Sequence, residues 1–180
     1  MASATCSCVA SSWLAEERPG CGVALYASSA LQAHAAARGL ALTGDDPDVV
    51  LLCRDERFDY GALNRIVRLV SRGARLIVAN GDNRHPGEDG YPVAETGALL
   101  AALRYVLPDM AFDIVGKPEA ALYDMALQRI GLPRDQVIAI GDNADTDFEG
   151  ARRYGLSCVL IGGASPTRPA NLDVMLAQDC

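Results

Sequence analysis

The chain has 180 residues, half of them hydrophobic and 22% charged, and its formal net charge at pH 7 is −7. This composition supports a packed core and excludes wholesale disorder. The acidic balance argues against nucleic acid and against an anionic membrane as partners, because both favour basic surfaces.

Strand-like and helical segments alternate along the chain. Short apolar runs predict strands, and longer periodic segments that end at Gly or Pro predict helices. The expected strands are residues 22–26, 49–53, 74–79, 112–115, 137–140 and 157–161. The expected helices are residues 9–17, 29–38, 59–72, 95–106, 118–130 and 146–154, with a last helical turn near 172–177. This alternation predicts an α/β fold with parallel sheets and helices packed on their faces.

Residues 80–90, NGDNRHPGEDG, consist almost entirely of turn-forming types. We expect a surface loop there. The same loop is the expected boundary between two α/β halves, residues 1–90 and 91–180.

The six cysteines show no Cys-x-x-Cys spacing, so we interpret them as reduced and mostly buried side chains of a cytoplasmic protein. A metal site at Cys6-Ser7-Cys8 is the alternative, although no further ligand lies close in sequence. The N-terminus lacks the basic segment of a signal peptide, and no run approaches the roughly 20 apolar residues of a membrane span. We therefore expect a soluble protein.

The most informative stretch is DQVIAIGDNADTDFEG, residues 135–150, in which an apolar strand ends at Gly141 and Asp142, Asp145 and Asp147 follow. Ligands of open α/β sheets bind beyond the carboxyl ends of the strands. Carboxylates held together without a cation repel one another, and Mg²⁺, which binds one or two carboxylates directly, removes that cost. The alternative is that Asp145 or Asp147 caps the following helix.

A second strand end, Val115-Gly116-Lys117-Pro118, brings a lysine to the same edge. Pro118 suits the first turn of a helix. A lysine at this place can pair with a carboxylate and neutralise phosphate oxygens. Alone, the tripeptide is better explained by a surface lysine, but the acidic motif that follows it favours a site.

These motifs together resemble the C-terminal half of haloacid-dehalogenase (HAD) superfamily phosphatases, most closely subclass IIA. The residues that carry the resemblance are Gly116-Lys117-Pro118, Gly141-Asp142-Asn143-x-x-Thr146-Asp147, Gly150-Ala151, Gly155 and Val159-Leu160-Ile161-Gly162-Gly163. The upstream residues Asp46-Pro47-Asp48-Val49-Val50, Gly73-Ala74-Arg75-Leu76-Ile77 and Asn80-Gly81-Asp82 resemble the α/β cap of that subclass. The resemblance implies part of a HAD-like Rossmannoid core plus a C2-type cap, and Mg²⁺-dependent hydrolysis of a phosphorylated small molecule.

The resemblance also implies roles for individual residues. Lys117 would steady the nucleophile and the phosphate. Asp142 would be the principal Mg²⁺ ligand, with Asp147 as a second ligand or a supporting acid and Asn143 beside the substrate.

In the cap, Asn80 and Asp82 would lie in a loop that faces the active site and contacts the substrate. Arg84 and His85 are candidate substrate contacts by their position in this loop, which an ordinary exposed loop explains equally well.

Phosphatases of this superfamily use an Asp-x-Asp nucleophile motif that directly follows the first apolar strand. Asp46-Pro47-Asp48 has the right spacing, but its apolar strand comes afterwards, so we interpret these acids as part of a turn that enters a strand. The chain begins roughly where the cap begins, and we expect it to be inactive alone or to be a truncated form.

Without the first strand of the core, the strand at residues 137–140 would expose an apolar open edge. We expect a complementing chain, self-association or rearrangement of the N-terminal segment to cover it. A catalytically inactive module that binds Mg²⁺ and phosphate is the alternative function.

Overall fold

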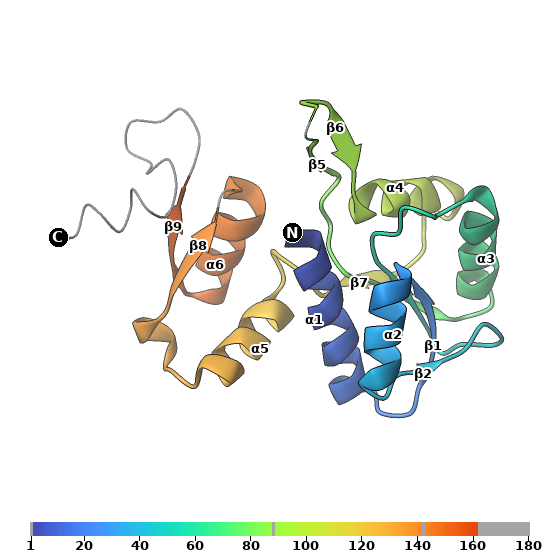
Figure 1. The fold of residues 1–180 in the computed structure, drawn as a ribbon, viewed down its shortest axis with the longest axis horizontal. Helices are drawn as coiled ribbons and strands as arrows, with labels where there is room; N and C mark the ends of the chain where they lie inside the picture. Colours follow the sequence, from blue (N-terminus) through green and yellow to red (C-terminus); the bar gives the residue numbers. More distant parts are fainter. Residues whose placement is uncertain (1, 88, 142, 162–180) are drawn as a thin grey trace. The chain divides into compact units, whose positions relative to one another are not determined.

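The computed structural model describes residues 2–87, 89–141 and 143–161 (Figure 1). The chain divides into two compact units, Met1–Gly116 and Lys117–Cys180. The division falls after Gly116 and not in the loop at residues 80–90, because a strand at residues 112–114 pairs within the sheet of the first unit. Among the described residues, no helix is long and apolar enough to cross a membrane.

A five-stranded parallel sheet forms the centre of the first unit. Its strand order is β2-β1-β3-β4-β7, with β1 (Gly22–Tyr26), β2 (Ala41–Leu42), β3 (Val49–Leu52), β4 (Arg75–Val78) and β7 (Phe112–Ile114). Every pair of neighbouring strands is parallel, as the sequence predicts. All four residues of β3, Val-Val-Leu-Leu, are buried, because a parallel strand in the middle of a sheet is covered on both faces.

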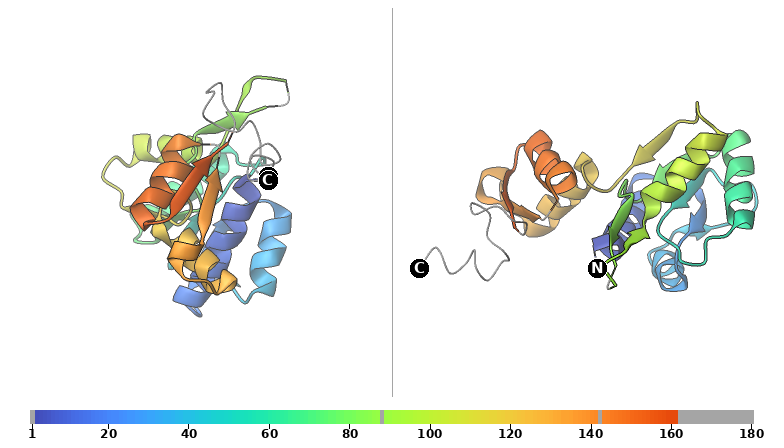
Figure 2. Two further views of the ribbon diagram at one scale, coloured as in Figure 1. Left: turned by 90° about the vertical axis from the view of Figure 1, so that its left-hand side faces the viewer. Right: turned by 90° about the horizontal axis from the view of Figure 1, so that it is seen from above.

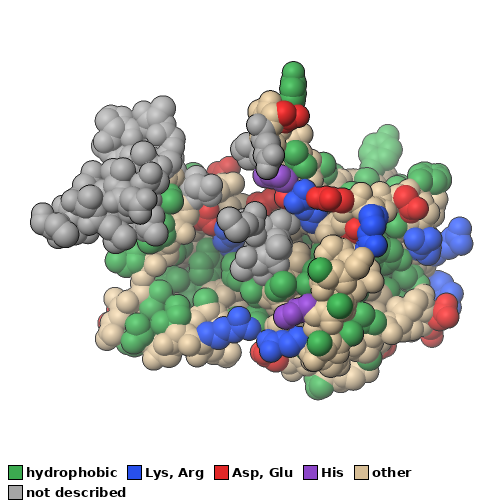
Figure 3. All heavy atoms as spheres, viewed as in Figure 1, with side chains coloured by type: hydrophobic (Ala, Val, Ile, Leu, Met, Phe, Trp, Pro, Cys, Tyr) green, Lys and Arg blue, Asp and Glu red, His purple; other side chains and the backbone are tan. Residues whose placement is uncertain are grey.

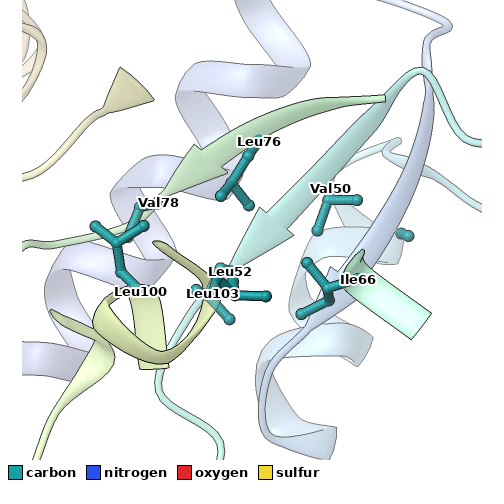
Figure 4. Close-up of a cluster of buried hydrophobic side chains, with 8 residues drawn as sticks. Val50, Leu52, Ile66, Leu76, Val78, Leu100 and Leu103 are labelled. Atoms are coloured by element: carbon teal, nitrogen blue, oxygen red, sulfur yellow. The ribbon is translucent and has the colours of Figure 1, made fainter. Parts of the chain in front are cut away.

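Helices cover both faces of this sheet (Figure 2). They are α1 (Ala2–Glu17), α2 (Ser29–Ala37), α3 (Tyr60–Ser71) and α4 (Thr96–Val106). On one face, Ile66 of α3 and Leu100 and Leu103 of α4 pack against alternate residues of β3 and β4 (Figure 4). Alternate strand residues point to opposite faces, so the other buried strand residues face α1 and α2.

The loop expected at residues 80–90 contains a β-hairpin. Strands β5 (Arg84–Pro86) and β6 (Pro92–Ala94) pair antiparallel, with His85 opposite Val93. The amide of Gly87 donates to the carbonyl of Tyr91 across the turn (2.8 Å). Three-residue strands that contain proline lack the alternating apolar pattern from which a hairpin can be predicted, and the turn residues dominate the sequence.

The second unit is smaller. It contains α5 (Ala120–Ile130), the 3₁₀ turn η1 (Arg134–Gln136), β8 (Ile138–Gly141), the π-helical turn η2 (Ala144–Phe148), α6 (Glu149–Tyr154) and β9 (Ser157–Leu160). Strands β8 and β9 are parallel neighbours. Tyr123, Ala151 and Leu156 form the buried centre of this unit. The sequence predicts one helix over residues 146–154, whereas the structure splits this segment into η2 and α6.

The core of the first unit can be tested with two substitutions on one helix. Leu103 is completely buried, and Tyr105 is 92% exposed. We expect Leu103→Ala to lower the free energy of unfolding by about 2–5 kcal/mol, because it leaves a cavity. Tyr105→Ala should change it by less than about 0.5 kcal/mol. Urea denaturation followed by circular dichroism measures both, and equal effects would contradict the packing of α4 on the sheet.

Candidate functional site

The carboxylate of Asp147 is the centre of a polar cluster in the second unit. Asp147 lies on η2 and is 6% exposed. Its Oδ1 accepts a hydrogen bond from Nζ of Lys117, and its Oδ2 accepts one from the amide of Asn143 (3.1 Å). A buried carboxylate requires such partners, because desolvation strongly disfavours an unpaired charge. The structure thus brings together three residues that the sequence predicts for the site: Lys117, Asn143 and Asp147.

Asn143 shapes the turn that presents this carboxylate. Its side-chain Oδ1 accepts hydrogen bonds from the amides of Asp145 (2.9 Å) and Thr146 (3.3 Å), which makes it the N-cap of η2. Its carbonyl accepts a bond from the amide of Asp147 (2.9 Å). Asn143, rather than Asp145 or Asp147, is therefore the capping residue. Single π-helical turns are frequent at functional sites.

Glycine is needed at two positions around the cluster. A Cβ on Gly141 would overlap the side chain of Asp147. A Cβ on Gly150 would lie 2.6 Å from the hydroxyl of Tyr123 and 2.9 Å from Cα of Pro118. Gly141 thus makes room for Asp147, and Gly150 lets α6 approach Pro118 closely, so both glycines have a steric reason.

Lys117 is the more accessible partner, since its side chain is 25% exposed and that of Asp147 is 8% exposed. The hydroxyl of Tyr123 donates to the carbonyl of Asp147 (3.3 Å). Burial first, and the charge of Asp147 second, raise the pKa of Tyr123. The same two causes, in the same order, raise the pKa of Cys158, which makes this thiol a poor nucleophile because the thiolate is the reactive form.

Asp142, the expected principal magnesium ligand, lies outside the described residues. Within the part of the chain that the structure describes, no three His, Cys, Asp or Glu side chains are grouped to hold a metal ion. Both oxygens of Asp147 already accept hydrogen bonds, from Lys117 and from Asn143. The hard carboxylate oxygens of this loop fit the chemistry of Mg²⁺.

Asn80 and Asp82 belong to the first unit and contact each other. Asn80 follows β4, is 1% exposed, and donates from its side-chain nitrogen to the carboxylate of Asp82 (3.0 Å). The side-chain oxygen of Asn80 is buried and has no hydrogen-bond partner among the described residues. Buried polar groups are normally paired, so this amide is an unusual feature of the sheet edge.

A buried carboxylate in the first unit was not predicted. Glu95 precedes α4 and is 5% exposed. One of its oxygens lies 2.7 Å from Nδ1 of His85 and 3.8 Å from Nε of Arg54. Figure 3 shows histidine, arginine and acidic side chains gathered at the foot of the β5–β6 hairpin. Sequence alone gave Glu95 only as the start of a helix, because its partners are distant in the chain.

Asp46 and Asp48 lie at the amino end of β3, at the opposite end of the sheet from Glu95. Both precede β3, and Asp48 Oδ2 accepts a hydrogen bond from the amide of Gly22 at the start of β1 (2.8 Å). Asp46 pairs with Arg72 (3.3 Å). These contacts agree with the interpretation of the acids as part of a turn that enters a strand.

Residues 114–174, which include Lys117 and the Asp147 loop, match the family model of HAD-hydrolase-like proteins. This match assigns residues 114–174 to the HAD-like hydrolases. Human glycerol-3-phosphate phosphatase is 34% identical over 118 residues, which cover 64% of this chain and 36% of that protein. Acid sugar phosphatase from Staphylococcus saprophyticus is 33% identical over 137 residues, which cover 76% of this chain and 52% of that protein.

Solved HAD-like phosphatases share the fold. The p-nitrophenyl phosphatase from Archaeoglobus fulgidus superposes with a TM-score of 0.82 at 26% identity, covering 96% of this chain and 66% of that chain. A glycerol phosphate phosphatase from Mycobacterium tuberculosis, in complex with calcium, gives 0.79 at 30% identity, covering 89% of this chain and 48% of that chain. The resemblance to subclass IIA phosphatases is confirmed. The chain nevertheless spans only about a third to a half of the length of these curated relatives.

The steric role of Gly141 can be tested with a matched glycine. We expect Gly141→Ala to displace Asp147 and to destabilise the second unit by about 1–3 kcal/mol, the usual cost of overpacking. Gly44 has no atom within 4 Å of the Cβ position, so Gly44→Ala should have little effect. Amide hydrogen exchange of β8 measures the local stability. Unchanged protection in Gly141→Ala would contradict the close approach of Asp147.

Proposed function

We propose that this chain supplies the phosphate- and magnesium-binding part of a cytoplasmic phosphate monoester hydrolase that acts on a phosphorylated small molecule. The observation that carries the proposal is the Asp147 carboxylate, which holds Lys117 beside the carboxyl end of β8. The names of the relatives, glycerol-3-phosphate phosphatase and acid sugar phosphatase among them, support the substrate class.

In the proposed site, Lys117 neutralises phosphate oxygens. Asp147 fixes the position of its ammonium group, and the Asn143 amide fixes Asp147 in turn. Asp142 would be the direct ligand of Mg²⁺, which when bound shields the negative charge of the phosphate. Asp147 supports the lysine and would be a second acid for the metal.

We propose substrate-binding residues for each unit by itself. Asn143 would lie beside the phosphate. In the first unit, which we assign to the cap, Asn80 and Asp82 are proposed substrate-binding residues, and their mutual hydrogen bond (3.0 Å) pre-orients them. Arg84 and His85 on the neighbouring strand β5 are further candidates.

Covalent phosphate transfer requires a nucleophile, and neither Lys117 nor Asp147 can serve as one in this arrangement. A carboxylate in an Asp-x-Asp motif must come from another segment or another chain. We therefore expect residues 1–180 to bind the cation and the phosphate without hydrolysing the ester.

The exposed side chains of β8 favour a role as one part of a larger assembly. Ile138 is 62% exposed and Ile140 is 45% exposed. Within the described residues, β8 pairs only with β9, so one edge of the strand and the apolar residues beside it lack a neighbour. Such edges commonly pair with a further strand. We propose that a second chain covers β8.

Cation binding tests the first proposal. We expect isothermal titration with Mg²⁺ to give saturable binding that Asp142→Ala weakens at least about tenfold, because a direct ligand is lost. Asp135→Ala removes an exposed acid of η1 and serves as the control of equal charge. The absence of Mg²⁺ binding by the unchanged chain would overturn the proposal.

Hydrolysis tests the absence of a nucleophile. With p-nitrophenyl phosphate and Mg²⁺, we expect the chain to give no more turnover than its Lys117→Ala, Asp142→Asn variant. Turnover that this variant abolishes would show that the chain holds its own nucleophile.

Self-association tests the open edge of β8. In a pure preparation a second copy is the only other chain that can cover this strand, so we expect sedimentation velocity to show concentration-dependent association that Ile138→Lys, Ile140→Lys abolishes. Ile130 and Leu132 have similar exposure outside the strand, 50% and 47%, and lysines there should leave the association unchanged. A wild-type chain that sediments only as a 19.0 kDa monomer would count against this idea.

A further inference from the structure

The order of strands in the first unit creates a crevice between β1 and β3. The chain leaves β1 through α2 toward β2 on one side, and leaves β3 through α3 toward β4 on the other. The two connections therefore diverge at the carboxyl ends of two neighbouring strands. In open parallel sheets, this switch in direction is where ligands bind.

A cavity of about 640 Å³ lies at this switch point. Residues 28–31, directly after β1, form one wall, and residues 54–57, directly after β3, form another. Ser7 and Cys8 of α1 and His34 of α2 complete the lining. The cavity falls within the usual size range of small-molecule sites, and it shares no residue with the Lys117–Asp147 cluster.

Two arginines give this cavity its chemistry. The guanidinium of Arg57 crosses the crevice, because its terminal nitrogen donates to the carbonyl of Ala27 (3.4 Å) at the end of β1. Its Nε also donates to Asp55 (3.4 Å). Since a guanidinium has five N–H donors, these bonds leave Arg57 able to bind an oxyanion as well, and its side chain is 61% exposed.

The guanidinium of Arg54 lies near two carboxylates, one buried and one exposed. Its Nε faces the buried carboxylate of Glu95 (3.8 Å), and a terminal nitrogen donates to Glu56 (3.0 Å). The side chain of Glu56 is 81% exposed, and such exposed pairs contribute little free energy. An anionic ligand in the cavity could therefore replace Glu56 as partner, while Glu95 keeps the guanidinium in place.

From the cavity, the strand order and the two arginines, we infer that the first unit binds a phosphate-bearing small molecule between β1 and β3. Arg54 and Arg57 bind the phosphate oxygens, because guanidinium groups match them in charge and geometry. Apolar atoms of Ala30 and Leu31 border the rest of the ligand. The amino end of α2 is already capped, since Ser28 Oγ accepts from the amide of Leu31 (3.4 Å), and the inference does not depend on that helix end.

Nitrogen-15 NMR of the full chain, titrated with inorganic phosphate, tests the inference. We expect saturable shifts of the amides of residues 28–31 and 54–57. The shifts should persist in Lys117→Met, so this result is separate from the proposed hydrolase site. Sodium chloride at matched ionic strength should not reproduce them.

Charge variants identify the arginines. Arg54→Met, Arg57→Met should weaken phosphate binding by about tenfold or more, because charge-assisted hydrogen bonds are lost. Arg65→Met, Arg68→Met removes the same charge from exposed positions of α3 and should leave the affinity unchanged.

A second variant tests the same site without changing the arginines, in case their removal prevents folding. Ser29→Glu places an acid in the first turn of α2, where it suits the helix but repels phosphate, and it should abolish binding. The inference is overturned if phosphate shifts only amides near Lys117 and Asp147. It is also overturned if no shifts occur, if sodium chloride reproduces them, or if Ser29→Glu binds phosphate as the unchanged chain does.

Discussion

The carboxylate of Asp147 determines the arrangement of the second unit. Its two oxygens accept hydrogen bonds from Lys117, at the start of the unit, and from the Asn143 amide, directly after β8. Because a carboxylate that is 6% exposed is costly without both partners, the pair fixes the chain on either side of α5. Gly141 and Gly150 follow from the same constraint, since a side chain at either would separate the segments that Asp147 joins.

The sequence predicts most of this arrangement because the pattern is local. Apolar runs place β8 and β9 to within about one residue, which is better than the usual accuracy of element boundaries, and the Gly-Asp-Asn motif places Asn143 and Asp147 in one turn. The split into η2 and α6 could not be predicted, since it arises from the hydrogen bonds of Asn143 and not from helix propensity. The sequence predicts that Lys117 pairs with an acid of the loop after β8. Which of these acids it contacts depends on the three-dimensional structure, where the partner is Asp147.

In the first unit, local patterns in the sequence are predictable, and contacts between distant residues are not. Its parallel strands are recognisable as apolar runs, yet β2 and the β5–β6 hairpin are too short to give a periodic pattern. The boundary between the units lies after Gly116, later than the turn-rich residues 80–90 indicate, because the pairing of β7 with β4 joins residues that are distant in sequence. Glu95 was missed similarly: its partners His85 and Arg54 approach it only once the hairpin and the β3 loop are folded.

Both units place charged groups at the carboxyl ends of parallel strands, but they balance them differently. In the second unit one buried acid holds one lysine, and the neighbouring strand β8 has exposed apolar side chains. In the first unit a buried acid, Glu95, stands behind Arg54, while the exposed Arg57 spans the two loops above β1 and β3. A buried acid that holds a more accessible cation is a common physical device in both units, because the acid fixes the position of the cation and leaves it able to bind an anion from solvent. In both proposed sites, phosphate recognition depends on the burial of these two carboxylates.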